Sequence, residues 1–221
     1  MRFGEGFGLR QAESRFLDCK TFRLHLLNEL TIGIFVYISF LLQKNYCTFD
    51  AQKTDEAFYY YKDGMKIVLL VIGKTDVSYW NEALKVYQER LIHYIPFEME
   101  VIPDIKNVKN MTEMQQKERE GISILKTLQA GDSCVLLDER GKEFTSVQFA
   151  SWLEKKLHSV PKRLVFIAGG PYGFSEEVYQ TVPEKISLSK MTFSHQMIRP
   201  IFVEQLYRAM TILRNEPYHH K

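Results

Sequence analysis

Hydrophobic residues follow a regular alternation of two patterns downstream of Met65. Short apolar runs of strand length alternate with longer segments whose apolar residues recur every three or four positions, which is the spacing of an amphipathic helix. Strands are expected at 66–72, 97–102, 133–137, 163–168 and 185–188, and helices at 77–94, 111–129, 145–157, from about 175, and 195–214. Five alternations predict an α/β fold in which helices cover both faces of a parallel sheet.

Upstream of Met65 this alternation is absent. The apolar stretch at 30–42 is shorter than the roughly 20 residues of a membrane-spanning helix. Acidic residues before it, and the lack of a small-residue cleavage site after it, argue against a signal peptide. We therefore divide the chain into an N-terminal extension, 1–64, and one domain, 65–221, and expect Met65 to be the true translation start. A genuine appendage that anchors the protein to a membrane surface is the alternative, and no stable membrane association is expected for 65–221.

The charge balance excludes a strongly basic nucleic-acid-binding protein. The chain has 29 basic and 27 acidic residues and a net charge of +2, so any RNA-binding surface must be a local patch. Its three cysteines form no CxxC pair, which suits the reducing cytoplasm and offers no metal-ligand set. Cys134 lies in an apolar run and is expected to be a buried structural thiol.

Two loops follow predicted strand ends, where parallel sheets bind their ligands. The first is Ala168-Gly-Gly-Pro-Tyr-Gly-Phe174, and the second spans 188–193. The glycines allow backbone to approach a ligand closely, although an ordinary tight turn explains them equally well. Their spacing is not GxGxxG, and the chain contains no GxxxxGK[ST] phosphate-binding loop.

The last predicted helix concentrates polar and aromatic side chains. His195 and Arg199 lie four residues apart and are expected to share a face near its start, and Glu204 and Arg208 can pair in the same way. Tyr207 lies beside Arg208, and such aromatic and cationic groups can stack on a base and hold phosphates. A solvated helix with a frayed tail is the simpler alternative.

Five segments together carry a family resemblance. They read FIAGGPYGF at 166–174, LSKMTF at 188–193, HQMIR at 195–199, EQLYRA at 204–209 and PYH at 217–219. In order and spacing they resemble the small ribosomal RNA large-subunit methyltransferases of the RlmH type, which belong to the SPOUT class. The resemblance covers 65–221 and none of 1–64. The sequence departs from the family pattern at Ser194, where Pro is frequent, and at Pro200, where an aliphatic residue is usual.

The resemblance implies a SPOUT fold with a C-terminal trefoil knot, a homodimer, and S-adenosylmethionine as methyl donor. It implies a substrate as well: a pseudouridine of 23S rRNA in assembled ribosomes, methylated at N3. The residues that it assigns to the cofactor are Leu137, Gly169, Gly170, Leu188, Ser189, Lys190, Met191, Thr192 and Phe193. Contacts with the target RNA are expected from Tyr207, Tyr218 and His219, across the dimer.

Three residues are candidates for catalysis: His195, Arg199 and Arg208. The proton on N3 must leave before the nitrogen can attack, and a neutral His195 is able to accept it. Arg199 is instead able to stabilise the resulting imide anion, and the residue types do not decide between them. Arg208 is expected to contact the target nucleotide.

Two other classes of protein also use such a sheet. A nicotinamide or flavin oxidoreductase should carry GxGxxG after its first strand, where this chain has Ile72-Gly-Lys-Thr-Asp76. A ribosome-binding module without catalytic activity would retain the fold but bind no S-adenosylmethionine.

Overall fold

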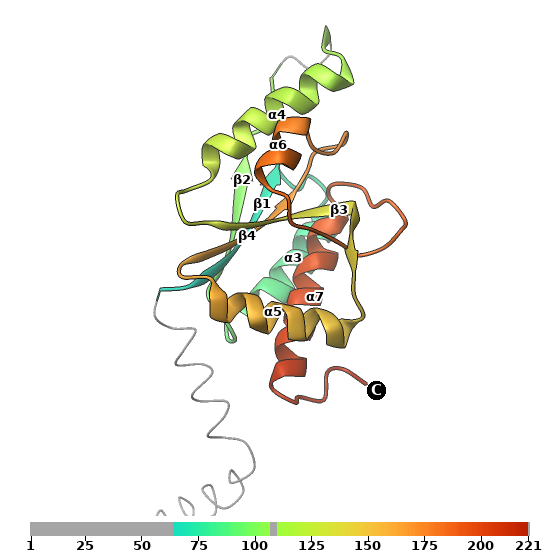
Figure 1. Cartoon of the computed structure of the whole chain (residues 1–221). Helices are drawn as coiled ribbons and strands as arrows, with labels where there is room; N and C mark the ends of the chain where they lie inside the picture. Colours follow the sequence, from blue (N-terminus) through green and yellow to red (C-terminus); the bar gives the residue numbers. More distant parts are fainter. Residues whose placement is uncertain (1–63, 107–109, 221) are drawn as a thin grey trace, which may run out of the picture. The chain divides into compact units, whose positions relative to one another are not determined.

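The computed structural model describes residues 64–106 and 110–220, which form an α/β domain around a five-stranded sheet (Figure 1). The strands are β1 (Lys66–Ile72), β2 (Phe97–Ile102), β3 (Ser133–Glu143), β4 (Arg163–Ala168) and β5 (Lys185–Ser187), and the helices are α3 (Ser78–Leu91), α4 (Glu113–Thr127), α5 (Ser146–Ser159), α6 (Glu176–Thr181) and α7 (Ile198–Leu213). The proposed extension, with its apolar stretch at 30–42, lies outside the described residues, apart from Gly64.

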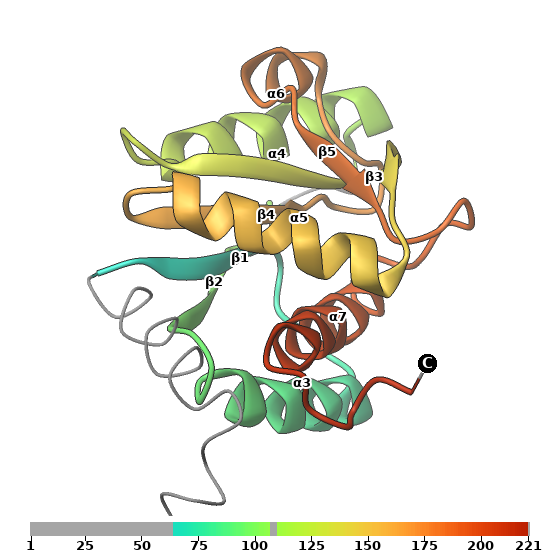
Figure 2. The same cartoon turned by 60° about the horizontal axis from the view of Figure 1, so that its bottom comes forward.

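All pairings in the sheet are parallel, in the order β2-β1-β4-β3-β5. Alternate residues of β1 enter different cores. Ile67 and Leu69 belong to the core under α3, α5 and α7, whereas Val68 and Leu70 belong to the core under α4 and α6. Figures 1 and 2 show these two groups of helices on opposite faces of the sheet. The predicted parallel sheet with helices on both faces is thus confirmed, while the trefoil knot stays a prediction.

The structure corrects two boundaries that matter for the site. Strand β3 continues to Glu143, beyond its predicted end at Leu137, and its extension pairs with β5 after a register shift between Leu137 and Lys142. This extension is polar, so the apolar pattern did not reveal it. Helix α7 begins at Ile198, and the predicted first residue, His195, lies in the turn before it.

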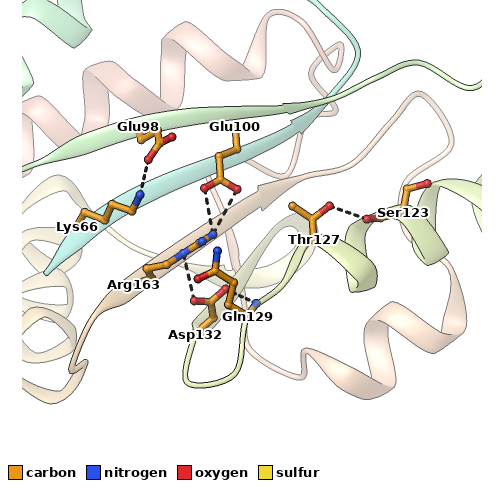
Figure 3. A network of polar contacts seen from close by, with 8 residues as sticks. All are labelled: Lys66, Glu98, Glu100, Ser123, Thr127, Gln129, Asp132 and Arg163. Atoms are coloured by element: carbon orange, nitrogen blue, oxygen red, sulfur yellow. Dashed lines mark hydrogen bonds and ion pairs between the residues drawn. The ribbon is translucent and has the colours of Figure 1, made fainter. Parts of the chain in front are cut away.

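A network of ion pairs lies near the amino ends of the strands (Figure 3). Arg163, at the start of β4, is buried and lies 3.2 Å from both Asp132 and Glu100. Lys66, at the start of β1, pairs with Glu98 of β2. These pairs link the starts of β1 and β4 to side chains of β2, and the start of β4 also to the residue before β3. They lie toward the amino ends of the strands, away from the loops predicted to carry the chemistry.

Candidate active site

The carboxyl ends of β3, β4 and β5 enclose a cavity of about 620 Å³, a size suited to a small organic ligand. Eight of the nine residues predicted to bind the cofactor line it: Leu137, Gly169, Gly170, Leu188, Ser189, Met191, Thr192 and Phe193. Lys190 is not among the lining residues, and its ammonium lies 3.9 Å from the Glu143 carboxylate. The fold therefore brings together two loops that are separated in the sequence, as the position of ligands in parallel sheets predicts.

The glycine loop after β4 is a tight turn in which the backbone conformation at Gly173 and a close contact at Gly170 both favour glycine. Gly173 N donates a hydrogen bond to Gly170 O at 3.2 Å, and Gly173 has a φ of +78°, which favours glycine. A Cβ atom on Gly170 would lie only 2.2 Å from Oε2 of Glu120 on α4. A side chain at 170 would therefore displace the Glu120 carboxyl, a close approach to α4 that the sequence motif did not reveal.

The second loop, 188–193, is braced by its own side chains and by β3. Ser187 Oγ donates to Ser189 O at 2.8 Å, and Met191 N donates to Ser189 Oγ at 2.9 Å. Thr192 Oγ1 donates to the Glu139 carboxylate at 2.8 Å. These bonds hold the loop in a defined conformation along one wall of the cavity, where its backbone groups can face a ligand.

The polar wall of the cavity was missed at the sequence level. Asp138, directly after the predicted end of β3, accepts a hydrogen bond from the Tyr179 hydroxyl at 2.5 Å, and its side chain is only 7% exposed. Burial, and then the hydrogen bond to Asp138, raise the pKa of Tyr179 to about 12. Glu139 and Arg140 follow on the same wall. An acidic residue just past an apolar strand was the signal available in the sequence.

His195 lines the cavity from the turn before α7. Burial lowers the pKa of His195, the positive charge of Arg199 lowers it further, and Asp104 and Asp76 oppose both effects. A lowered pKa keeps the imidazole neutral at neutral pH, which is the form that accepts a proton.

Arg199 is buried, and its hydrogen bonds join α7 to the end of β1. It is 1% exposed, and its guanidinium donates to Ile72 O at 2.6 Å and to Gly73 O at 3.0 Å. Further bonds reach Thr75 Oγ1 and His195 O. Arg199 does not line the cavity, so this geometry supports a positioning role for it and gives no support to direct contact with an imide anion.

The two departures from the family pattern fit the local backbone. Ser194 Oγ accepts a hydrogen bond from Met197 N at 3.2 Å, and its carbonyl accepts from Ile198 N at 3.0 Å, so it caps the turn before α7. Pro200 is the third residue of α7, within the first turn, where the missing N–H of proline has no partner to lose.

The other predicted functional residues lie near the far end of α7, away from the cavity. Arg208 pairs with Glu204 at 2.5 Å, which confirms the predicted pairing, and its guanidinium lies 4.7 Å from the ring centre of Tyr218. Tyr207 contacts Tyr218 at 4.8 Å between ring centres. Nδ1 of His219 is buried and has no hydrogen-bond partner among the described residues. None of these residues lines the cavity of the same chain.

Within 64–106 and 110–220, no group of three acidic, histidine or cysteine side chains is arranged to hold a metal ion, and no helix is both long and apolar enough to cross a membrane. Cys134, expected to be buried, is half-buried. Its partial burial raises the pKa of the thiol to about 11.

Comparisons with known proteins agree on one family. The profile of a family described as predicted SPOUT methyltransferase matches residues 65–219. The ribosomal RNA large subunit methyltransferase H of Parabacteroides distasonis is 74% identical over 157 residues, which are 71% of this chain and 100% of that protein. The proteins of the same name from Phocaeicola vulgatus and Bacteroides fragilis are 64% and 62% identical with the same coverage.

Proposed function

The chain belongs to the SPOUT methyltransferase family, and from this premise we propose that it transfers a methyl group from S-adenosylmethionine to N3 of a pseudouridine of 23S rRNA in assembled ribosomes. The observation that carries the proposal is that two loops distant in the sequence, 168–174 and 188–193, line the same cavity at neighbouring strand ends. The relatives named as ribosomal RNA large subunit methyltransferases supply the substrate class.

The residues around the cavity fit the proposed methyl donor. Turns close to the cavity offer backbone groups for an adenosyl moiety, and Asp138 and Glu139 place carboxylates on the wall near a cationic ligand. When bound, S-adenosylmethionine supplies a methyl group activated by its positively charged sulfur. The protein's main contribution is to orient the acceptor nitrogen against that group, and such positioning is worth about 7–11 kcal/mol of barrier.

Removal of the N3 proton is assigned to His195. Its imidazole lines the cavity, and its lowered pKa keeps the nitrogen lone pair free at neutral pH. Arg199 holds the turn that carries His195, since its Nε donates to His195 O at 2.9 Å. In this assignment Arg199 acts through His195 rather than on the substrate.

A second copy of the chain completes the proposed site. Tyr207 and Arg208 lie in the second half of α7, and Tyr218 and His219 lie in the tail that follows it. None of them lines the cavity of the same chain. In a homodimer the tail of one copy supplies these groups to the target nucleotide at the cavity of the other. The buried, unpartnered Nδ1 of His219 is a polar group that such a contact would satisfy.

Transfer of labelled methyl groups tests the function directly. The purified full-length chain should label 23S rRNA in ribosomes that lack the modification, with the label on pseudouridine, and calorimetry should detect S-adenosylmethionine binding. Binding of the cofactor without transfer to any ribosomal particle would refute the substrate. Binding of ribosomes without the cofactor would favour a ribosome-binding module that has lost catalysis.

We further propose that translation begins at Met65 and that the product acts in the cytoplasm. The matched stretch of 157 residues spans the whole of each relative, and the Met65 side chain packs in the main core with 5% exposure. The intact mass of the protein isolated from its natural host checks this. A mass that includes residues 1–64 refutes it.

A further inference from the structure

Glu120, on the sheet-facing side of α4, is a buried carboxyl group with an unmet hydrogen-bonding atom. It is 3% exposed, and its Oε1 accepts a hydrogen bond from Gln116 Nε2 at 2.8 Å. Its Oε2 is buried and has no hydrogen-bond partner among the described residues. Buried polar atoms nearly always form a hydrogen bond, so the unpaired Oε2 of Glu120 calls for an explanation.

The unpaired Oε2 of Glu120 lies against the glycine loop of the cavity. A Cβ atom built on Gly170 would be 2.2 Å from Glu120 Oε2 and 2.8 Å from the carboxyl carbon. The next residue, Gly121, allows a second close approach, since its Cβ would lie 2.2 Å from Oγ of Ser175. Ser175 caps α6, directly after the loop. Residues 120 and 121 are therefore where α4 meets the loop.

We propose that Glu120 is a positioning residue for cofactor binding, whose carboxyl group hydrogen bonds to the backbone of the glycine loop 169–173 when that loop closes on its ligand. Gly170 lines the cavity and Glu120 does not, so the effect passes through the loop. This inference rests on the proposed function, because it takes S-adenosylmethionine as the ligand.

The surroundings of Glu120 favour its uncharged form. Burial raises the pKa of Glu120, and the negative charge of Asp104 raises it further, whereas the hydrogen bond from Gln116 opposes both. A protonated Oε2 donates to a backbone carbonyl of the loop, and an ionised Oε2 accepts from a backbone N–H. A glutamine at this position would present an N–H donor in a side chain of nearly the same shape.

A purely packing role for Glu120 predicts a different result from a hydrogen-bonding role. If Glu120 contributes packing alone, a methionine of similar length should preserve the affinity for the cofactor. Thermal stability reports packing, and the dissociation constant reports the position of the loop, so both quantities are needed.

The test measures S-adenosylmethionine binding to full-length variants by calorimetry, with melting temperatures alongside. Glu120→Met should weaken binding about tenfold, the usual worth of a lost hydrogen bond, and Glu120→Gln should stay within about threefold of the unmodified chain. The matched control is Glu118→Ala, which changes an exposed carboxylate on the same helix and should leave affinity unchanged.

A second pair of variants probes the contact with Gly170. Gly170→Ala should weaken binding by more than tenfold, because the new methyl group displaces the Glu120 carboxyl. Adding Glu120→Ala should recover part of that loss, because the smaller side chain leaves room for the methyl group. Independent, additive losses would contradict a direct contact.

Two results would overturn the inference. The first is unchanged affinity in Glu120→Met, even if its melting temperature shifts, because that is the signature of packing alone. The second is a loss in Glu120→Gln as large as that in Glu120→Met. If the unmodified chain fails to bind the cofactor, the proposed function fails, and this outcome is distinct from both.

Discussion

Replacing Arg199 with methionine tests whether this residue positions the site or acts on the substrate. Methionine has a similar length but no donors. The change removes four hydrogen bonds, two of which join the guanidinium to the buried carbonyl oxygens of Ile72 and Gly73. These two bonds connect α7 to the end of β1, 126 and 127 residues earlier in the chain.

The expected loss of stability follows from those two bonds. A hydrogen bond that involves a charged group contributes about 1.5–3 kcal/mol, which gives about 3–6 kcal/mol for the pair. Part of this is offset, because methionine avoids the cost of burying a charged group. The remaining two acceptors, Thr75 Oγ1 and His195 O, are in partly buried bonds and can be reached by water. We expect a net loss of about 3 kcal/mol in the free energy of unfolding.

Urea unfolding followed by fluorescence measures this loss by linear extrapolation. Arg208→Met is the matched control on the same helix. Arg208 pairs with Glu204 through side chains that are 26% and 16% exposed, so its loss should cost no more than about 1 kcal/mol.

The result that refutes the reasoning is an Arg199→Met protein within about 0.5 kcal/mol of the unmodified chain that has nevertheless lost methyl transfer. Such a protein would show that Arg199 acts on the imide directly. A positioning role predicts instead that stability, cofactor affinity and transfer all decline.

Three other changes have distinct expected outcomes. His195→Gln should leave unfolding within about 0.5 kcal/mol and slow single-turnover transfer by about 10²–10⁴-fold, the usual contribution of a general base; a normal rate would exclude that role. Because the pKa of His195 is lowered, its neutral form persists to lower pH than usual. Transfer should therefore decline with this group only below about pH 6.5, and a decline linked to it at higher pH would contradict the assignment. Arg163→Met should cost about 3 kcal/mol in urea, because it leaves Asp132 and Glu100 without their cation at the edge remote from the cavity. Cofactor affinity should be kept, and a loss below about 1 kcal/mol would contradict the role of this network. Deleting 217–221 should abolish transfer and keep the cofactor dissociation constant within about threefold, whereas equal loss of both, or loss of neither, would contradict the assignment of the tail to the RNA.

Much of the fold could be predicted from the sequence because it depends on local patterns. Four strands match their expected spans to within one residue, since buried parallel strands appear as continuous apolar runs. The start of the helix expected at 145–157 is local in the same way, because Thr145 Oγ1 accepts from Gln148 N and forms a capping box at the start of α5. The polar extension of β3 has no such pattern and was missed.

The cavity was predictable only in part. The spacing of the motifs identified the two loops that line it, because ligands of parallel sheets bind beyond the strand ends. The same spacing placed Arg199 on a shared helix face with His195, whereas the structure buries its guanidinium against β1. It also did not distinguish Glu120 from the exposed acidic residues of α4.

What the sequence alone determined, then, is the succession of strands and helices along the chain and the identity of the two loops. The tertiary structure decided which polar groups are removed from water. Arg199 meets Ile72, and Glu120 meets Gly170, across long separations in the chain. Contacts of this kind depend on how α4 and α7 pack against the sheet. They leave no periodic trace in the sequence, because periodicity records only which face of an element is buried.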